Sequence, residues 1–522
     1  MSTELQRLPR PASESIDSSL WVDEAIWGHR LYDEQVPWLT FLEFLTVLRG
    51  EWSNDRAFKE PNGPNHLQYP TQHFLYLRNV LFNNPTLSRM LVLHPDDDTR
   101  WSNWISDMSK RASGVDPKEF GYLKSRFASM EDFVALVELL RSTAIEGSSN
   151  KRWTSKFVFP YGPHCLYEDL RLERDGRASN DRRFFARTGE ILYLMLCRSG
   201  LGEELIQELR PLVLDENTRW NRLVHLLERS TSEGEVQNRQ RSAYLPYSQL
   251  PAFKKLAEDW LALLRLRMPG YDVFPHLVDM VGVHLVLYFL QRASEWVHKK
   301  PRLTLVLEIL APKRTTIRDL AAETYLENNL LSRQAIQKFI DREIVQTDDW
   351  RLAKGSSDSF GNAAKVVYER VLWKAVEGDQ RGYVGQQTPN ALIENLREAV
   401  EKRHRQHLAN IHSQYSRAIG LASKRGTRTL RYAPTDLLLK TLVFATVPNR
   451  MEFQTFLELL HERYCFVVGH RQARQFIGTG ASDQRAFEEN AKRLELRLSS
   501  LGMLKRLSDA CAYVQNPLGA SQ

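Results

Sequence analysis

Two groups of side chains in this sequence have types that can support catalysis. In the first, the segment HPDDD at residues 94–98 places Asp96, Asp97 and Asp98 close to His94. Clustered Asp carboxylates can hold Mg²⁺ for the hydrolysis of phosphodiesters. A Pro followed by Asp residues also commonly begins a helix, where a carboxylate accepts the free N–H groups of the first turn. We expect capping here and keep a metal-dependent nuclease as the alternative.

The second group lies between residues 158 and 190 and combines His, Cys, carboxylates and arginines. Its members are His164, Cys165, Glu168, Asp169, Asp181, Arg182, Arg183, Arg187 and Glu190. Neighbouring His and Cys residues rarely face one another, so they do not by themselves make a catalytic dyad. We expect a buried network of arginines and carboxylates that ties a loop to a helical domain. Glu168, Asp169 and Asp181 remain an alternative set of metal ligands for a nuclease.

The sequence lacks the motifs of several enzyme classes. P-loop ATPases, HExxH metalloproteases, GxSxG hydrolases, zinc deaminases and protein kinases are excluded on this ground. Its four cysteines, at 165, 197, 465 and 511, form no C-x-x-C pair, which disfavours a disulfide framework and a Cys-ligated zinc site. We predict no cofactor and identify no small-molecule substrate, and a non-catalytic role is favoured.

Positive charge is concentrated in one segment. Residues 381–450 contain 12 Lys and Arg against 4 Asp and Glu, a net charge of +8, so the other 452 residues sum to −1. Localised positive charge is typical of proteins that bind nucleic acid, because Lys and Arg neutralise phosphates and release counterions. A solvated helix face that contacts no partner is the alternative. The predicted DNA contacts are Lys402, Arg403, Arg405, Lys424, Arg425, Arg428 and Arg431. Nearby His404, His407 and His412 lack a well-spaced carboxylate and are a weak metal signal.

The overall composition is that of an ordinary globular chain. Of its 522 residues, 42% are hydrophobic, 10% aromatic and 26% charged, which excludes a chain disordered along its whole length. The N-terminus is polar and lacks the apolar core of a signal peptide. The most apolar run, His276–Leu290, contains Asp279 and is too short to span a bilayer, so we expect a buried helix. A cytoplasmic location without membrane contact follows.

Helical spacing of apolar residues dominates the chain, which predicts a mainly α, multi-domain protein. Polar segments such as EGSSN at 146–150 and STSEGEVQN at 230–238 are candidate linkers. The expected organisation is a flexible N-terminus (1–19), helical domains at 20–150 and 151–300, a winged-helix-like domain (301–380), a basic helix and loop (381–433), and a second winged-helix-like domain (434–522).

The first winged helix-turn-helix candidate lies at residues 302–376. We expect a helix at Leu303–Leu310, a second at Ile317–Glu327 capped by Thr316, and a third at Arg333–Val345 capped by Ser332 after a turn at Asn328–Leu331. The residues from Gln346 would form a small wing. The third helix would present Arg333, Gln334, Gln337 and Lys338 outward, the second predicted set of DNA contacts.

The second candidate, at residues 434–516, is better formed. We expect helices at Asp436–Thr446, Phe453–Tyr464 and Gln484–Ser499, with a short strand at 465–469. Gly502 would end the last helix before strands at Met503–Leu507 and Ala510–Val514. Glu488 and Glu489 on the last helix repel phosphate, which favours protein binding or weak DNA binding for this copy. The pattern resembles the winged-helix superfamily over about 80 residues.

Three phrases, DEAIWGHRLYDEQVPWLTFLEFL, FVFPYGPHCLYEDL and NDRRFFARTGEILYLML, resemble a component of the methylation-associated antiphage defence systems of bacteria. The resemblance implies other defence-system proteins as partners, including a methyltransferase and ATPase or nuclease subunits. Together with the basic segment, it predicts a non-catalytic DNA-binding and protein-binding component of a defence complex. A metal-dependent nuclease subunit and a pure protein scaffold without nucleic-acid contact are the alternatives.

Overall fold

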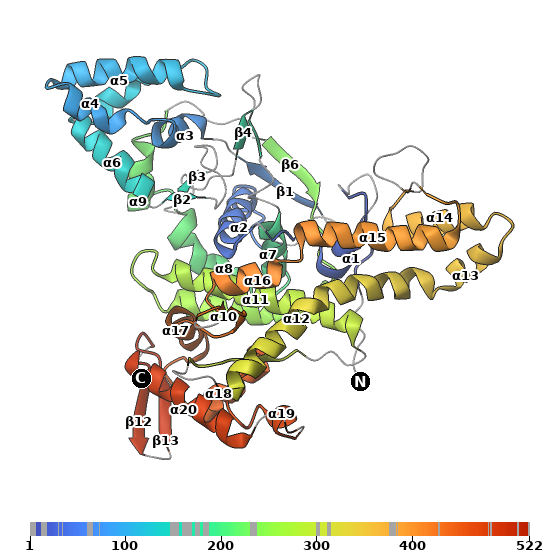
Figure 1. Ribbon diagram of the computed structural model, residues 1–522. Coiled ribbons are helices and arrows are strands. Elements are labelled where there is room, and N and C mark those ends of the chain that lie inside the picture. The colour runs from blue at the N-terminus through green and yellow to red at the C-terminus, as the bar shows by residue number, and fades with distance from the viewer. Residues whose placement is uncertain are drawn as a thin grey trace. The chain divides into compact units, whose positions relative to one another are not determined.

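The computed structural model places most of the chain in helices, which confirms the mainly α fold class (Figure 1). The described residues divide into two compact units. Unit 1 comprises residues 1–37, 198–201 and 242–522, and unit 2 comprises residues 38–197 and 202–241. The structure describes residues 7–11, 18–29, 31–33, 35–59, 66–71, 74–142, 144–146, 156–158, 170–172, 178–180, 187–229, 237–298, 303–310, 315–374, 383, 385–425, 428–478, 480, 483–508 and 511–519.

Unit 2 is a set of short helices with small two-stranded sheets. The pairs are β1 with β6, β2 with β3, and β4 with β5. Helices α4, α5 and α6 pack around the aromatic residues Trp101, Trp104 and Phe133. The elements are α2 (Pro37–Trp52), β1 (His66–Thr71), α3 (Leu75–Phe82), α4 (Leu87–Leu93), α5 (Asp97–Arg111), η2 (Gly121–Arg126), α6 (Met130–Ser142), β2 (Ala144–Glu146), β3 (Lys156–Val158), β4 (Leu170–Leu172), β5 (Ala178–Asn180), α7 (Thr188–Cys197), α8 (Gly202–Leu209), η5 (Arg210–Leu214), α9 (Arg219–His225) and β6 (Gln237–Ser242).

Unit 1 is built around one long apolar helix, α11. By length and composition α11 could cross a membrane, but 94% of its most apolar window is buried inside the protein. The expectation of a buried helix at this run is therefore confirmed. The helices of unit 1 are α1 (Asp23–Trp27), α10 (Pro251–Arg265), α11 (Val273–Val297), α12 (Thr316–Ile340), η6 (Asp341–Val345), α13 (Asp348–Gly355), α14 (Ser359–Val371), α15 (Pro389–His407), α16 (Ile411–Ala418), α17 (Asp436–Thr446), α18 (Phe453–Tyr464), α19 (Arg474–Gly478) and α20 (Gln484–Ser500).

The expected helix-turn-helix at 302–376 is not present. Residues 328–332 continue α12 without a turn, residues 305–306 form strand β7 (Leu305–Val306), and the expected wing forms α13. The polar residues expected to break α12 are satisfied by distant groups instead. The Asn328 amide donates to the Thr304 carbonyl and to the Tyr432 hydroxyl, both at 3.0 Å. The helix is therefore continuous because its polar positions are buried with partners. Its cap is Thr315, whose hydroxyl accepts from the Arg318 N–H.

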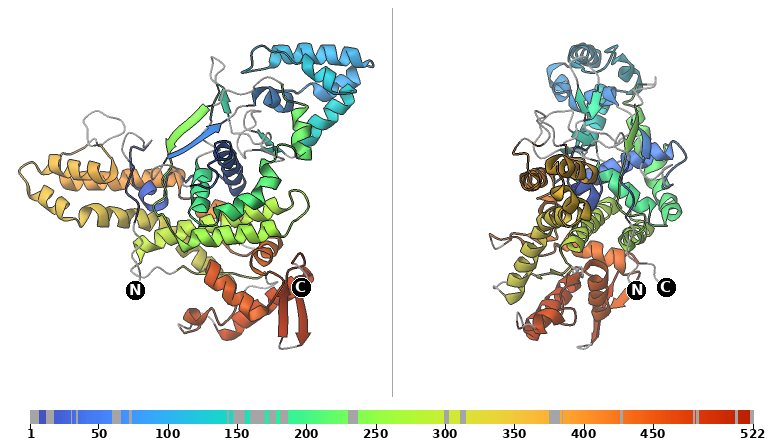
Figure 2. Two further views of the ribbon diagram at one scale, coloured as in Figure 1. Left: turned by 180° about the vertical axis from the view of Figure 1, so that it is seen from behind. Right: turned by 90° about the vertical axis from the view of Figure 1, so that its right-hand side faces the viewer.

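The elements expected at 434–516 are confirmed closely. Helices α17 and α18 have the expected bounds, α20 ends one residue later than expected, and Gly502 has φ 72°. The strands are β8 (Ala422–Ser423), β9 (Arg431–Tyr432), β10 (Arg450–Glu452), β11 (Phe466–Val467), β12 (Leu504–Ser508) and β13 (Cys511–Gln515). Strand β13 lies between β10 and β12 in an antiparallel sheet, and β11 pairs with β7. The β12–β13 hairpin projects beside α20 in both views of Figure 2.

Candidate nucleic-acid interface

A short basic hairpin connects β8 to β9. The strands are antiparallel, with Ala422 opposite Tyr432 and Ser423 opposite Arg431. Lys424, Arg425 and Arg428 lie in the connection and are exposed. None of the carboxylates that the structure describes forms an ion pair with these three side chains. Their positive charge is therefore available to an external anion.

Arg431, at the base of the same hairpin, has a different role. Its guanidinium is fully buried and pairs with Glu308, which is also fully buried. Glu308 accepts a second ion pair from Arg318 of α12 at 2.9 Å. Arg431 also donates to the Arg425 carbonyl at 2.8 Å, which holds the hairpin in place. Because its charge is enclosed, Arg431 cannot reach a phosphate, and we remove it from the predicted DNA contacts.

The basic residues of α15 divide in the same way. Lys402 and Arg405 are exposed. Arg403 lies against α1, where its guanidinium pairs with Asp23 at 3.3 Å and Glu24 at 2.6 Å. Burial raises the pKa of Asp23 to about 7 although Arg403 opposes the shift. Burial also disfavours the charge of Arg403, but Glu24 and Asp23 raise its pKa. Arg403 therefore joins α15 to α1, and we remove it as well.

The three histidines near this segment belong to the interior of unit 1. The His404 Nε2 lies 3.0 Å from the Ser332 hydroxyl, and the His412 Nε2 lies 2.8 Å from the Tyr432 hydroxyl. Burial lowers the pKa of His404 to about 4 and that of His412 to about 3, so both are neutral at pH 7. The His407 ring packs edge-on against Tyr32. No group of three His, Cys, Asp or Glu that could hold a metal occurs within the described ranges.

The second predicted DNA-contact set lies on the surface of α12. Arg333 is 61% exposed but forms a 2.5 Å ion pair with Glu401 of α15. Lys338 is 52% exposed and lies 4.0 Å from Asp341. Gln334 is exposed and Gln337 is half-buried. Because the carboxylates of Glu401 and Asp341 share this surface, it attracts phosphate less strongly than the hairpin does.

The Asp residues of HPDDD serve separate structural purposes in unit 2. Asp96 caps α5 by accepting the Thr99 N–H at 2.8 Å, and the hydrogen bonds from the Thr99 hydroxyl and N–H lower the pKa of Asp96. Asp97 accepts from the Trp101 indole at 3.1 Å and the Met130 N–H at 3.0 Å. Asp98 pairs with a lysine from η2 at 2.6 Å. The expected cap is confirmed, and the three carboxylates do not converge on one point.

Part of the 158–190 group forms the expected buried network. The Arg187 Nε donates to Glu190 at 2.8 Å, and the Tyr69 hydroxyl donates to the other oxygen of Glu190 at 2.7 Å. Glu43 of α2 accepts the N–H groups of Arg187 and Gly189 at the start of α7. Outside the described residues lie His164, Cys165, Glu168, Asp169, Asp181, Arg182 and Arg183.

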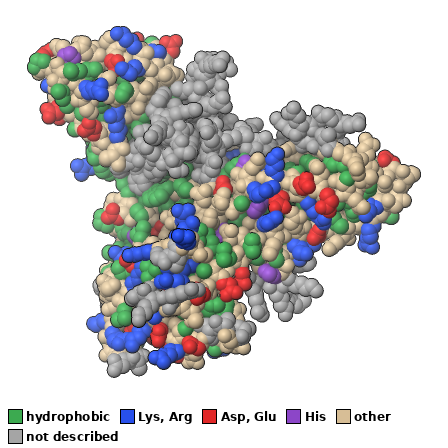
Figure 3. Space-filling view, viewed as in Figure 1, with side chains coloured by type: hydrophobic (Ala, Val, Ile, Leu, Met, Phe, Trp, Pro, Cys, Tyr) green, Lys and Arg blue, Asp and Glu red, His purple; other side chains and the backbone are tan. Residues whose placement is uncertain are grey.

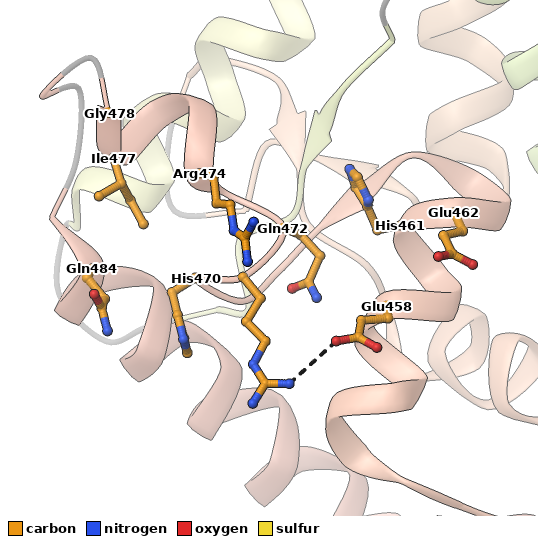
Figure 4. A pocket seen from close by; sticks show the side chains of 10 residues that line it. Glu458, His461, Glu462, His470, Gln472, Arg474, Ile477, Gly478 and Gln484 are labelled. Carbon is orange, nitrogen blue, oxygen red and sulfur yellow. Dashed lines mark hydrogen bonds and ion pairs between the residues drawn. The ribbon is translucent and has the colours of Figure 1, made fainter.

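A polar groove lies between α18, α19 and the start of α20, at residues for which no functional role was expected from the sequence (Figure 4). Its volume is about 890 Å³. Arg471 lines it and pairs with Glu458 at 3.4 Å. The segment HRQAR at 470–474, which follows β11, supplies His470, Arg471, Gln472 and Arg474. Its density of polar side chains in a short loop was the available signal.

Figure 3 shows that Lys and Arg side chains gather over the C-terminal elements of unit 1, in the lower part of the view. Acidic side chains are interspersed among them on this face.

A comparison with known protein families finds a match for the part of the chain that carries the β8–β9 hairpin. Residues 386–516 match the model of a family described as methylation-associated defense system protein MAD7. The match runs from α15 to β13 and includes the basic hairpin, the groove and the three-stranded sheet. It confirms the resemblance to a component of methylation-associated defence systems. No curated protein and no solved structure matches the chain.

Proposed function

We propose that this defence-system component binds duplex DNA without cleaving it, through the C-terminal part of unit 1, and that it also binds partner proteins. The observation that carries the DNA contact is the β8–β9 hairpin, where Lys424, Arg425 and Arg428 are exposed and unpaired among the described carboxylates. Three exposed positive charges in one short connection can contact a phosphate backbone independently of base sequence. Lys402 and Arg405 of α15 are also exposed, and we include them among the proposed DNA contacts.

The topology next to the hairpin supports a winged-helix fold, which binds DNA in some proteins and other proteins in others. Helices α17, α18 and α20 alternate with strands so that β10 follows α17 and the β12–β13 hairpin follows α20. The strand order β10-β13-β12 and this helix order are those expected of a winged helix. In such modules the last helix is the recognition helix and the final hairpin is the wing. We therefore propose a winged-helix fold for residues 434–516.

Fluorescence anisotropy of a labelled duplex tests the DNA contact, with Mg²⁺ present and the DNA checked on a gel afterwards. We expect binding that weakens steeply with salt and leaves the DNA intact. Reversal of Lys424, Arg425 and Arg428 to Glu should weaken binding while the thermal unfolding curve is unchanged, because exposed side chains contribute little to stability. Unchanged affinity would refute the hairpin as the contact, and cut DNA would support the nuclease alternative.

A second role, protein binding, is favoured at α20 itself. Its surface carries Glu489 in ion pairs with Arg485 at 3.4 Å and Arg493 at 3.3 Å, so much of its positive charge is already compensated. Leu496 and Leu507 are each 61% exposed on α20 and β12. Exposed leucines beside compensated charges are more typical of a protein interface than of a DNA-reading surface. Leu496→Glu should therefore disrupt co-purification with other components of the system and leave DNA affinity unchanged.

A further inference from the structure

The groove between α18, α19 and α20 has two chemically different walls (Figure 4). The α18 wall carries Glu458, His461 and Glu462. The opposite wall carries Arg474 and Ile477 of α19 together with Gln484 at the start of α20. A volume of about 890 Å³ lies within the range of pockets that accept small organic ligands.

An amide without partners lies between the two walls. Both the oxygen and the nitrogen of the Gln472 side chain are buried, and neither is hydrogen-bonded. Buried polar groups in native proteins almost always have partners, so this amide requires one from outside the described chain. An amide offers a donor and an acceptor side by side. The N7 acceptor and N6 donor of adenine match that pair, whereas guanine presents two acceptors on the same edge.

The charges around the amide also match a nucleotide. Arg474 is exposed and forms no ion pair with a described carboxylate, so its guanidinium can receive a phosphate. Glu462 is exposed on the other wall, where a carboxylate can accept hydrogen bonds from ribose hydroxyls. A peptide main chain would also match Gln472, but it would leave the free guanidinium of Arg474 without a role.

We propose that this groove binds an adenine nucleotide, with the base on the Gln472 amide, the sugar toward α18 and the phosphate at Arg474. Binding requires rotation of the Gln472 side chain so that its shielded amide faces the ligand. The nucleotide can be free or part of a single RNA strand, and both sources present an adenine base, a ribose 2′-hydroxyl and a phosphate. The proposal does not depend on the DNA contact at the β8–β9 hairpin.

Isothermal titration calorimetry of the full chain tests this site with AMP, adenosine, GMP and a single-stranded oligo(A) RNA as probes. We expect AMP to bind at least 10-fold more tightly than GMP. Gln472→Leu should weaken AMP binding at least 10-fold, because it removes both hydrogen-bonding groups. Gln472→Glu should weaken it too, because a carboxylate cannot donate to N7. Arg474→Gln should weaken AMP binding but not adenosine binding.

Two controls separate this proposal from the others. Arg485→Gln removes an exposed charge of α20 outside the groove and should leave AMP binding unchanged. Neutralising Lys424, Arg425 and Arg428 should reduce duplex binding and leave AMP binding intact. Binding of AMP alone assigns a free nucleotide, and binding of the oligonucleotide that AMP displaces assigns a strand. Absence of binding by AMP and the oligonucleotide, or wild-type affinity in a folded Gln472→Leu variant, would overturn the proposal.

Discussion

Neutralising the basic hairpin should change the salt dependence of DNA binding by an amount that the structure fixes. Lys424, Arg425 and Arg428 are exposed and have no described carboxylate partner, so each can neutralise one phosphate. Each phosphate contact contributes about 0.9 to the slope of log affinity against log salt. Three contacts therefore contribute a slope of about 2.7, which is roughly a 40-fold loss of affinity between 50 and 200 mM salt.

The assay is anisotropy of a labelled duplex over a series of salt concentrations, for the wild type and for the variant with Lys424, Arg425 and Arg428 changed to Gln. We expect the slope of the variant to be shallower by about 2.7. A matched control changes three exposed basic residues of unit 2, Arg89→Gln, Lys110→Gln and Lys118→Gln, which alters net charge equally. Equal slopes in the hairpin variant and the wild type would refute the reasoning.

Three further predictions concern stability. Arg431→Met should lower the free energy of unfolding by about 3–5 kcal/mol, because the buried Glu308 would keep its charge and retain only Arg318 as an ion-pair partner. A loss below about 1 kcal/mol in urea unfolding would contradict the enclosed ion pair. Burial raises the pKa of Asp279 from 3.8 to about 7, so the folded state binds this proton more tightly than the unfolded state does. The free energy of unfolding that Asp279 contributes therefore falls as the pH rises from 3.8 to about 7. Asp279→Asn should therefore raise the melting temperature relative to wild type more at pH 8 than at pH 5, and an equal shift at both values would argue against a protonated carboxyl. Gly189→Ala should destabilise unit 2 by about 1–3 kcal/mol, because a Cβ there would lie 2.6 Å from the Cβ of Glu43; calorimetry that shows an unchanged transition would mean that this contact relaxes.

Local signals were sufficient where an element depends on its own residues. Helices α17, α18 and α20 each follow a residue whose side chain accepts an N–H of the first turn: Thr435, Glu452 and Asp483. Their apolar spacing and the glycine at 502 complete the pattern. These features act within a few residues, so the sequence predicts α17 and α18 with the correct bounds and α20 to within one residue.

The long helix α12 shows where local signals fail. Asn328 and Ser332 are residue types that commonly cap helices or form turns, which is why the sequence predicts a break in the helix here. In the fold, Asn328 donates to Thr304 and Tyr432, and Ser332 lies 3.0 Å from His404. Partners up to about a hundred residues away remove the cost of burying these groups, so the helix continues.

The sequence by itself determined the helical class, the elements of residues 434–516, the concentration of positive charge near residue 424 and the resemblance to a defence-system component. Only the tertiary structure decided which of those positive charges remain exposed and able to bind a phosphate. Arg403 and Arg431 have the same residue type as Arg405 and Arg425, but the fold places Asp23, Glu24 and Glu308 against the first two. The groove around Gln472 also depends on three elements meeting in space. Pairing of charges is set by contacts across the fold, and spacing along the chain does not carry that information.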